Sequence, residues 1–177
     1  MIVPAVPDFP TGISSPSLLN QLGDVVAFQL APPIARLMQT VAQSLTTGVY
    51  TPITFDTHTV DTNVAGTPQH DDVTNNSRFT AVYPGWYSPG GGTGYAANSA
   101  GRRGNRWQVN GTFINGTLVI LSATAAGGCY VPTRRELIYL NVGDYLELTA
   151  FQDSGGALLT AVGADQSSTM TVYWVSN

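Results

Sequence analysis

From residue 34 onward the chain consists of short stretches in which apolar and polar residues alternate, separated by turns rich in glycine and asparagine. The alternation is clear in Arg78 to Tyr83, in Tyr145 to Gln152 and in Met170 to Val175. Asn110-Gly111 is the favoured sequence of a two-residue β-hairpin turn. Many short strands with such turns are typical of a sandwich or jelly roll. We therefore predict one all-β domain over residues 34–177.

The first 33 residues differ from the rest and predict an appendage. Residues 1–12 are rich in proline and should be extended. Ser15 or Ser17 can cap a helix that ends at the proline pair 32–33. A helix of this length is marginal alone in water, so its apolar face must dock on its own domain, on symmetry mates or on a larger structure. The residues of this face are the candidate anchor: Leu18, Leu22, Val25 and Val26.

Charged residues make up only 10% of the chain, and the net charge is −4. A surface with few ions costs little to desolvate, which suits packing against copies of the same chain or into an assembly. A coding bias is the alternative, and it would also explain why the chain has no lysine. Net negative charge argues against binding nucleic acid. No run approaches the ~18 apolar residues of a membrane span, and no secretory leader is recognisable, so we expect synthesis in a cytoplasm.

Several stretches in their order along the chain resemble the jelly roll of the complement globular-head and tumour-necrosis-factor family. They are Ile53 to Asp56, Arg78 to Thr80, Pro84 to Tyr87, Val109 to Gly111 and Leu140 to Leu148. The resemblance covers residues 34–177. It implies a ten-stranded jelly roll that packs as a homotrimer around aromatic and aliphatic residues. The N-terminal appendage and the closing strand are similar to versions in phages of actinobacteria, where such proteins are minor tail or other virion proteins.

One stretch departs from the family pattern. Residues 88–94 contain Pro89 and four glycines where the family has a regular strand of alternating apolar residues. Proline removes a ladder donor, and glycine weakens a strand. Two explanations remain open: the strand lies at a sheet edge, or it is packed so closely that side chains are excluded.

Aromatic side chains are the best lead to interaction surfaces, because they combine apolar area with a hydrogen-bonding tip. On the predicted strands we expect core or trimer-interface roles for Tyr145, Leu148, Tyr173 and Trp174. Tyr95 and Tyr130 are expected in loops, where they could contact a ligand. The basic cluster Arg102, Arg103 and Arg106 could contact phosphate or an acidic glycan, or could be a solvated loop.

The candidates for chemistry are weak. His58, Asp61, His70, Asp71 and Asp72 are of metal-ligand type but follow no zinc spacing. The resemblance allows a calcium ion at Asp71 or Asp72, and a polar loop without metal is the simpler interpretation. The chain has no Gly-x-Ser-x-Gly motif and no evident pair of catalytic carboxylates, so we expect neither enzymatic activity nor a cofactor.

Two functions remain open, both on the surface of a phage particle. The first is a trimeric tail protein that binds a host cell-surface glycan through its loops. The second is a capsid decoration protein that docks by its N-terminal arm. The expected partners are other copies of the chain, other virion proteins and, for the first function, the glycan.

Overall fold

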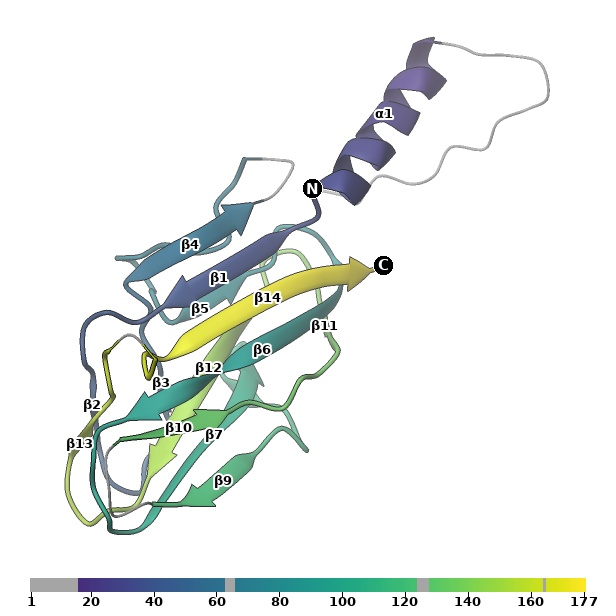
Figure 1. Ribbon diagram of the computed structural model, residues 1–177. Coiled ribbons are helices and arrows are strands. Elements are labelled where there is room, and N and C mark those ends of the chain that lie inside the picture. Colours follow the sequence, from purple (N-terminus) through teal and green to yellow (C-terminus); the bar gives the residue numbers. More distant parts are fainter. Residues whose placement is uncertain (1–15, 63–65, 124–127, 164) are drawn as a thin grey trace.

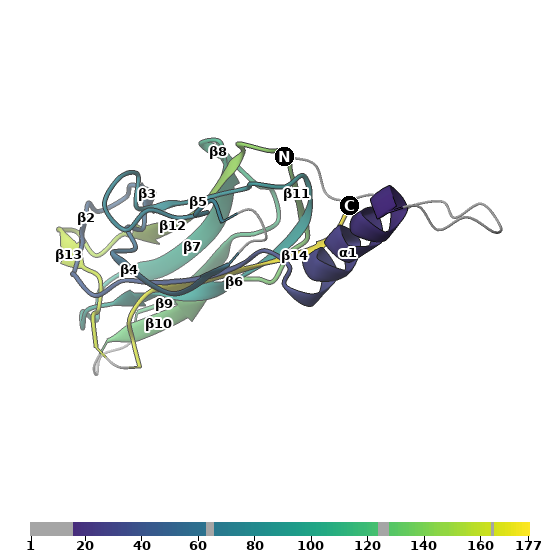
Figure 2. The same cartoon turned by 90° about the horizontal axis from the view of Figure 1, so that it is seen from above.

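The computed structural model describes residues 16–62, 66–123, 128–163 and 165–177. These residues form one helix, α1 (Pro16–Leu30), and fourteen strands. Four of the strands have only two residues, and the other ten are longer. Figures 1 and 2 show two β-sheets packed face to face, with α1 projecting beyond one end of the sandwich. The predicted all-β fold with a helical appendage is confirmed.

Sheet I contains six antiparallel strands. Its order is β10 (Cys129–Pro132), β6 (Gly85–Tyr95), β14 (Thr169–Ser176), β1 (Ile34–Met38) and β4 (Thr57–Thr62), with β11 (Ile138–Leu140) also paired to β6. The first and last long strands of the domain are therefore neighbours, because β1 pairs with β14 along its whole length.

Sheet II also has six strands. Its order is β3 (Thr51–Pro52), β12 (Tyr145–Gln152), β7 (Arg102–Val109) and β8 (Thr112–Phe113), with β5 (Arg78–Thr80) paired to β12 and β9 (Val119–Ser122) paired to β7. A separate ribbon joins β2 (Ser44–Leu45) to β13 (Leu158–Leu159).

The core lies between the two sheets, where the alternating residues of each strand meet. Leu146 and Leu148 of β12 point inward, as do Met170 and Val172 of β14, and all four are fully buried. The hairpin predicted at Asn110-Gly111 is confirmed, because β7 and β8 pair directly across it. Both turn residues have positive φ angles, 51° and 76°, which asparagine and glycine tolerate best.

The glycine-rich stretch forms β6, which lies inside sheet I between β14 and the β10–β11 side. Two explanations were open for the proline and glycines of residues 88–94. The strand is not at a sheet edge, and close packing that excludes side chains is the correct explanation. A Cβ atom at Gly94 would overlap the backbone oxygen of Gln166, and one at Gly92 would overlap the ring of Tyr130. These positions exclude side chains because neighbouring backbone passes directly over the strand.

The sequence also predicts strands over residues 36–44 and 49–55, followed by a long polar stretch over 56–77, and the structure differs at all three. The strand predicted over 36–44 ends at Met38, and the one predicted over 49–55 shrinks to β3. Side chains take over the hydrogen bonding there, since Gln43 binds the backbone of Thr54 and Asp56 binds that of Thr40. The stretch 56–77, expected to be an irregular polar loop, contains β4, which pairs with β1.

Candidate functional site

The outer face of sheet I carries large apolar side chains that no described residue covers. Strand β14 alternates, so Trp174 faces the core while Tyr173 and Val175 face outward. Tyr173 is 43% exposed, and Trp86 on β6 is 41% exposed. The ring of Trp86 meets that of Tyr139 edge to face, with centroids 5.5 Å apart. We call Trp86, Tyr139, Tyr173 and Val175 the sheet I face.

A second group of exposed apolar side chains lies at the β9 edge of sheet II. Strand β9 pairs only with β7 among the described strands, and it exposes Ile120 and Leu121. Phe113 and Leu118, which precede β9 in the sequence, are also exposed. The chain therefore presents two apolar surfaces on different parts of the sandwich.

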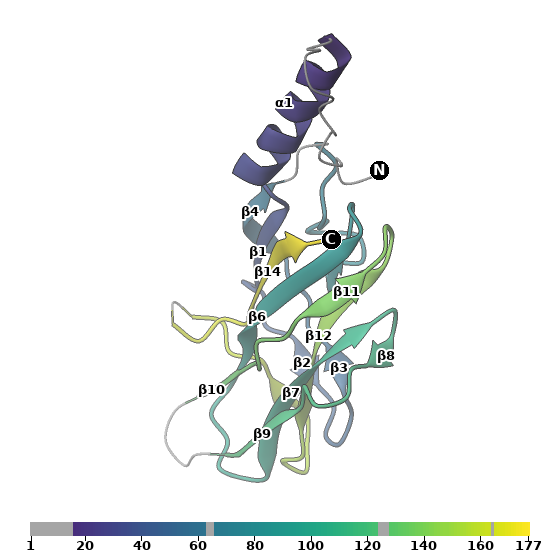
Figure 3. The ribbon, with the colours of Figure 1, turned by 90° about the vertical axis from the view of Figure 1, so that its right-hand side faces the viewer.

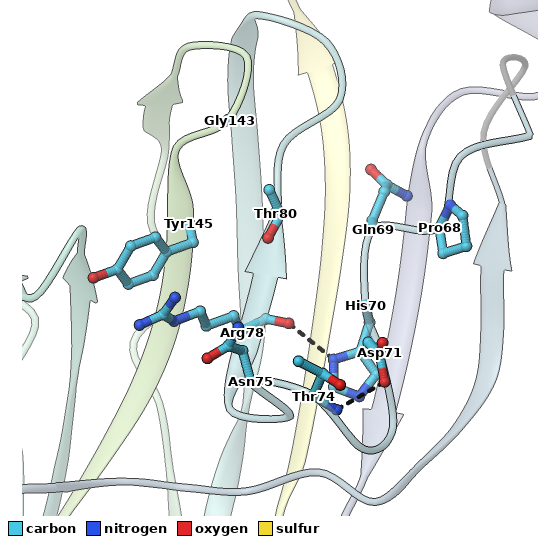
Figure 4. A pocket seen from close by; sticks show the side chains of 10 residues that line it. All are labelled: Pro68, Gln69, His70, Asp71, Thr74, Asn75, Arg78, Thr80, Gly143 and Tyr145. Atoms are coloured by element: carbon cyan, nitrogen blue, oxygen red, sulfur yellow. Dashed lines mark hydrogen bonds between the residues drawn. The ribbon is translucent and has the colours of Figure 1, made fainter.

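A polar groove opens beside β5, with a volume of about 630 Å³ that falls within the range of ligand pockets. Figure 4 shows its walls, which come from two stretches of the chain, residues 68–80 and 143–145. The lining residues are Pro68, Gln69, His70, Asp71, Thr74, Asn75, Arg78, Thr80, Gly143 and Tyr145. We call this the β5 groove.

Among the described residues that line this groove Arg78 is the only arginine, and it is held in place from two sides. Its guanidinium carbon lies 3.9 Å from the centroid of the Tyr145 ring, a cation–π contact. Its Nε lies 3.5 Å from the carboxylate of Glu147. That carboxylate is buried and also accepts hydrogen bonds of 2.6 Å from Ser77 and from Gln108. The arginine is therefore oriented in advance while about a third of its side chain remains exposed.

His70 has a structural role at the base of the groove. Its ring is buried, with Nδ1 2.8 Å from the carbonyl oxygen of Arg78 and Nε2 3.1 Å from that of Phe55. Asp61 accepts hydrogen bonds from the backbone N–H groups of Gln69 and His70. This histidine thus joins the 66–77 segment to β5 and to the connection between β3 and β4, and both of its ring nitrogens have protein partners.

The two neighbouring aspartates also have protein partners. Asp71 accepts hydrogen bonds of 2.8 Å from the backbone of Val73 and of Thr74, which lower the pKa of its carboxyl group. Asp72 lies 3.0 Å from Nδ1 of His58, and this hydrogen bond raises the pKa of His58. The described residues contain no group of three potential metal ligands. His70, Asp71 and Asp72 each have a hydrogen-bonding partner within the protein.

The predicted ligand residues separate into buried and exposed ones. Tyr95 was expected in a loop, but it ends β6 and is fully buried, with its hydroxyl donating to the carbonyl of Gly104. Burial raises its pKa. Arg103 is also buried and donates to the carbonyl oxygens of Asn98 and Ala100. The expectation that these two residues contact a ligand is wrong, because neither side chain reaches the surface.

The basic cluster is part of strand β7, so the expectation that these arginines lie in a solvated loop is wrong. Arg102 is exposed and forms a 2.7 Å ion pair with Asp153. Arg106 is stacked between the rings of Tyr50 and Phe113. Tyr130 remains accessible on β10, with its hydroxyl 3.0 Å from that of Thr169.

The four residues assigned to core or interface take three different positions. Leu148 and Trp174 belong to the core, Tyr173 belongs to the sheet I face, and Tyr145 is half-buried under Arg78. In α1, Leu22 and Val26 are exposed, while Leu18 and Val25 are half-buried. No local sequence pattern marks the β5 groove, because only the fold brings residues 68–80 together with Gly143 and Tyr145.

Two solved structures have the same arrangement of two jelly-roll sheets. The globular domain of a zebrafish complement 1qA protein matches with a TM-score of 0.54 and 13% identity, covering 82% of this chain and 99% of that one. Murine APRIL matches with a TM-score of 0.55 and 11% identity, covering 80% and 98%. The fold is a tumour-necrosis-factor-like jelly roll. No protein-family model matches the sequence, and no curated protein is detectably similar to it.

Proposed function

We propose that the protein is a structural component of a bacteriophage particle, a non-enzymatic homotrimeric module on the tail that faces the host. The observation that carries the proposal is the sheet I face, an aromatic surface that the described residues leave uncovered. Large exposed apolar patches on a stable domain mark interaction sites. The sequence resemblance to phage virion proteins supplies the setting.

The two apolar surfaces favour a ring of copies. When one surface of a molecule binds a different surface of the next copy, the contact is heterologous and closes into a ring if the rotation allows it. The sheet I face and the β9 edge with Ile120 and Leu121 both expose apolar side chains. Arg135 lies beside Ser88 and Tyr173 on the sheet I side. The family resemblance implies three copies in the ring.

The β5 groove is the best place for a host ligand. Arg78 offers a charged donor beside the face of Tyr145, and Thr74, Thr80 and Asn75 add polar groups. Sugars are bound by such combinations of an aromatic ring with hydrogen-bonding side chains. A trimer would present three grooves, and avidity would compensate for weak individual contacts.

A second candidate function is capsid decoration. One observation favours it: α1 is the only described element that projects from the sandwich, and it is too short to act as a long fibre shaft. A short projecting arm suits a protein that docks directly on a shell.

Antibody-gold labelling of intact particles separates the two functions. Gold confined to the tail end supports host recognition and directs attention to the β5 groove. Gold scattered over the head would replace that function by decoration. Particles without label, produced by a host that expresses the protein, would contradict a virion role altogether.

A further inference from the structure

The helix α1 is amphipathic, and its apolar side does not face its own domain. The side is made by Leu19, Leu22, Val26 and Leu30, which are 55%, 37%, 46% and 80% exposed. We call these four residues the α1 stripe. The only charged residue of the helix is Asp24, which lies about 160° around the helix axis from Leu22 at 100° per residue. Ser17 and Asn20 lie on the same side of the helix as Asp24, opposite the α1 stripe, while Gln29 lies about 20° from Leu22 on the stripe side.

The contact between α1 and the sandwich uses a different side chain. Phe28 is 1% exposed, and its ring meets those of Tyr83 and Trp174 edge to face, with centroids 4.9 Å and 4.7 Å away. Phe28 lies about 120° around the helix from Leu22. Docking through Phe28 therefore holds the C-terminal end of the helix and leaves the stripe pointing elsewhere.

The position of the helix identifies what can cover the stripe. The backbone N–H of Trp174 donates to the carbonyl of Pro33, so α1 leaves the sandwich at the C-terminal end of β14. Figure 3 shows the helix continuing beyond this end of the sheet. Tyr173 and Val175 of the sheet I face lie on the same end of β14. The stripe is therefore close to the surface through which the copies are proposed to associate.

We infer that the α1 helices of the associated copies pack against one another along their stripes and form a short helical bundle. A rotation axis brings the same element of each copy together, so an apolar stripe near the axis meets its own equivalents. The four residues of the stripe are separated by three, four and four positions, a spacing that places them all on one side of the helix. Asp24 stays on the outside, so the copies bring no charges together.

This inference rests on the proposed self-association and assigns Leu22 and Val26 to contacts between copies instead of contacts with the particle. A helix of 15 residues is marginal alone, and the bundle would supply the packing that it lacks. Attachment to the particle would then use the outside of the bundle or the chain that precedes it.

Cross-linking of the full chain tests the inference. Cys129, the single cysteine, is first replaced in a Cys129→Ala background, and Leu22→Cys is then compared with Asn20→Cys, which lies on the opposite side of the helix. A short bis-maleimide should join chains through position 22 and leave position 20 uncross-linked. Light scattering on the same samples should give the mass of three chains for both variants.

Each other outcome has a distinct meaning. A trimeric mass with no cross-linking at position 22, or with equal cross-linking at both positions, would overturn the bundle and leave self-association standing. A monomeric mass would remove the proposed trimer and the bundle together. If Leu22→Asp leaves the trimer intact but stops its incorporation into particles, and position 22 does not cross-link, another virion protein covers the stripe.

Discussion

Phe28 of α1 and Trp174 of β14 meet edge to face, with their ring centroids 4.7 Å apart. The indole N–H of Trp174 donates to the carbonyl of Pro84, which orients the ring that receives Phe28. This pair joins the appendage to the last strand of the sandwich. The helix is therefore tethered at one end by a buried aromatic contact.

Replacing Phe28 by alanine should lower the free energy of unfolding by roughly 3 kcal/mol, because a buried ring is lost and a cavity remains. Urea unfolding measures this difference. Val73→Ala is the control, since that side chain is 85% exposed and should change stability by less than about 0.5 kcal/mol. Equal effects of the two substitutions would show that Phe28 does not pack as described.

Replacing Gly94 by alanine should prevent folding or lower the melting temperature strongly, because the new methyl group would overlap the backbone of Gln166. Gly90 in the same strand is the matched control, since a Cβ atom there meets nothing within 4 Å. Thermal unfolding followed by circular dichroism compares the two variants. A Gly94→Ala protein as stable as Gly90→Ala would contradict the close packing of β6.

The His58–Asp72 pair should make a small, pH-dependent contribution to stability. The hydrogen bond to Asp72 raises the pKa of His58 above its usual 6.5. A raised pKa in the folded state stabilises the protein fully below pH 6.5, and the contribution is lost as the pH rises through the folded-state value. Both side chains are over a third exposed, so the contribution should be below about 1 kcal/mol.

Urea unfolding of the wild-type protein and of His58→Gln at pH 6 and pH 8.5 measures this contribution. The difference in stability between the two proteins should be larger at pH 6. Comparing the two proteins at each pH cancels the titration of other groups. A difference that does not change with pH would contradict the ion pair.

The β5 groove gives a prediction for the proposed host ligand. Arg78→Ala should reduce binding of the labelled protein to host cells several-fold, because the groove loses the only arginine among the described residues that line it. Arg134→Ala is the control, since that arginine is exposed and lies outside the groove. Cell binding is measured by flow cytometry, with unfolding curves to confirm that both variants fold. Unchanged binding by Arg78→Ala would exclude this groove.

Local patterns predicted much of the architecture. The alternation in β12 and β14 and the Asn110-Gly111 turn are set by neighbouring residues, and the structure has them as expected. Helix α1 also begins and ends where the serine and proline signals indicated.

What the sequence could not show depends on distant parts of the chain. Strand β6 is central because it pairs with β14 on one side and with β10 and β11 on the other, and these strands are distant from it in the sequence. Arg103 looked like a surface cation, but three carbonyl oxygens satisfy its guanidinium inside the fold. The β5 groove combines residues 68–80 with Gly143 and Tyr145, which are distant in the sequence, so no local pattern could reveal it.

The most direct test of the central claim is the mass of the full chain in solution, measured by size-exclusion chromatography with light scattering. Wild-type protein should elute with the mass of three chains. Tyr173→Asp should shift it to a monomer, because a charge would be placed in the middle of the sheet I face. Leu159→Asp, at an exposed position on β13, should leave the mass unchanged. A wild-type protein that is monomeric would contradict the account.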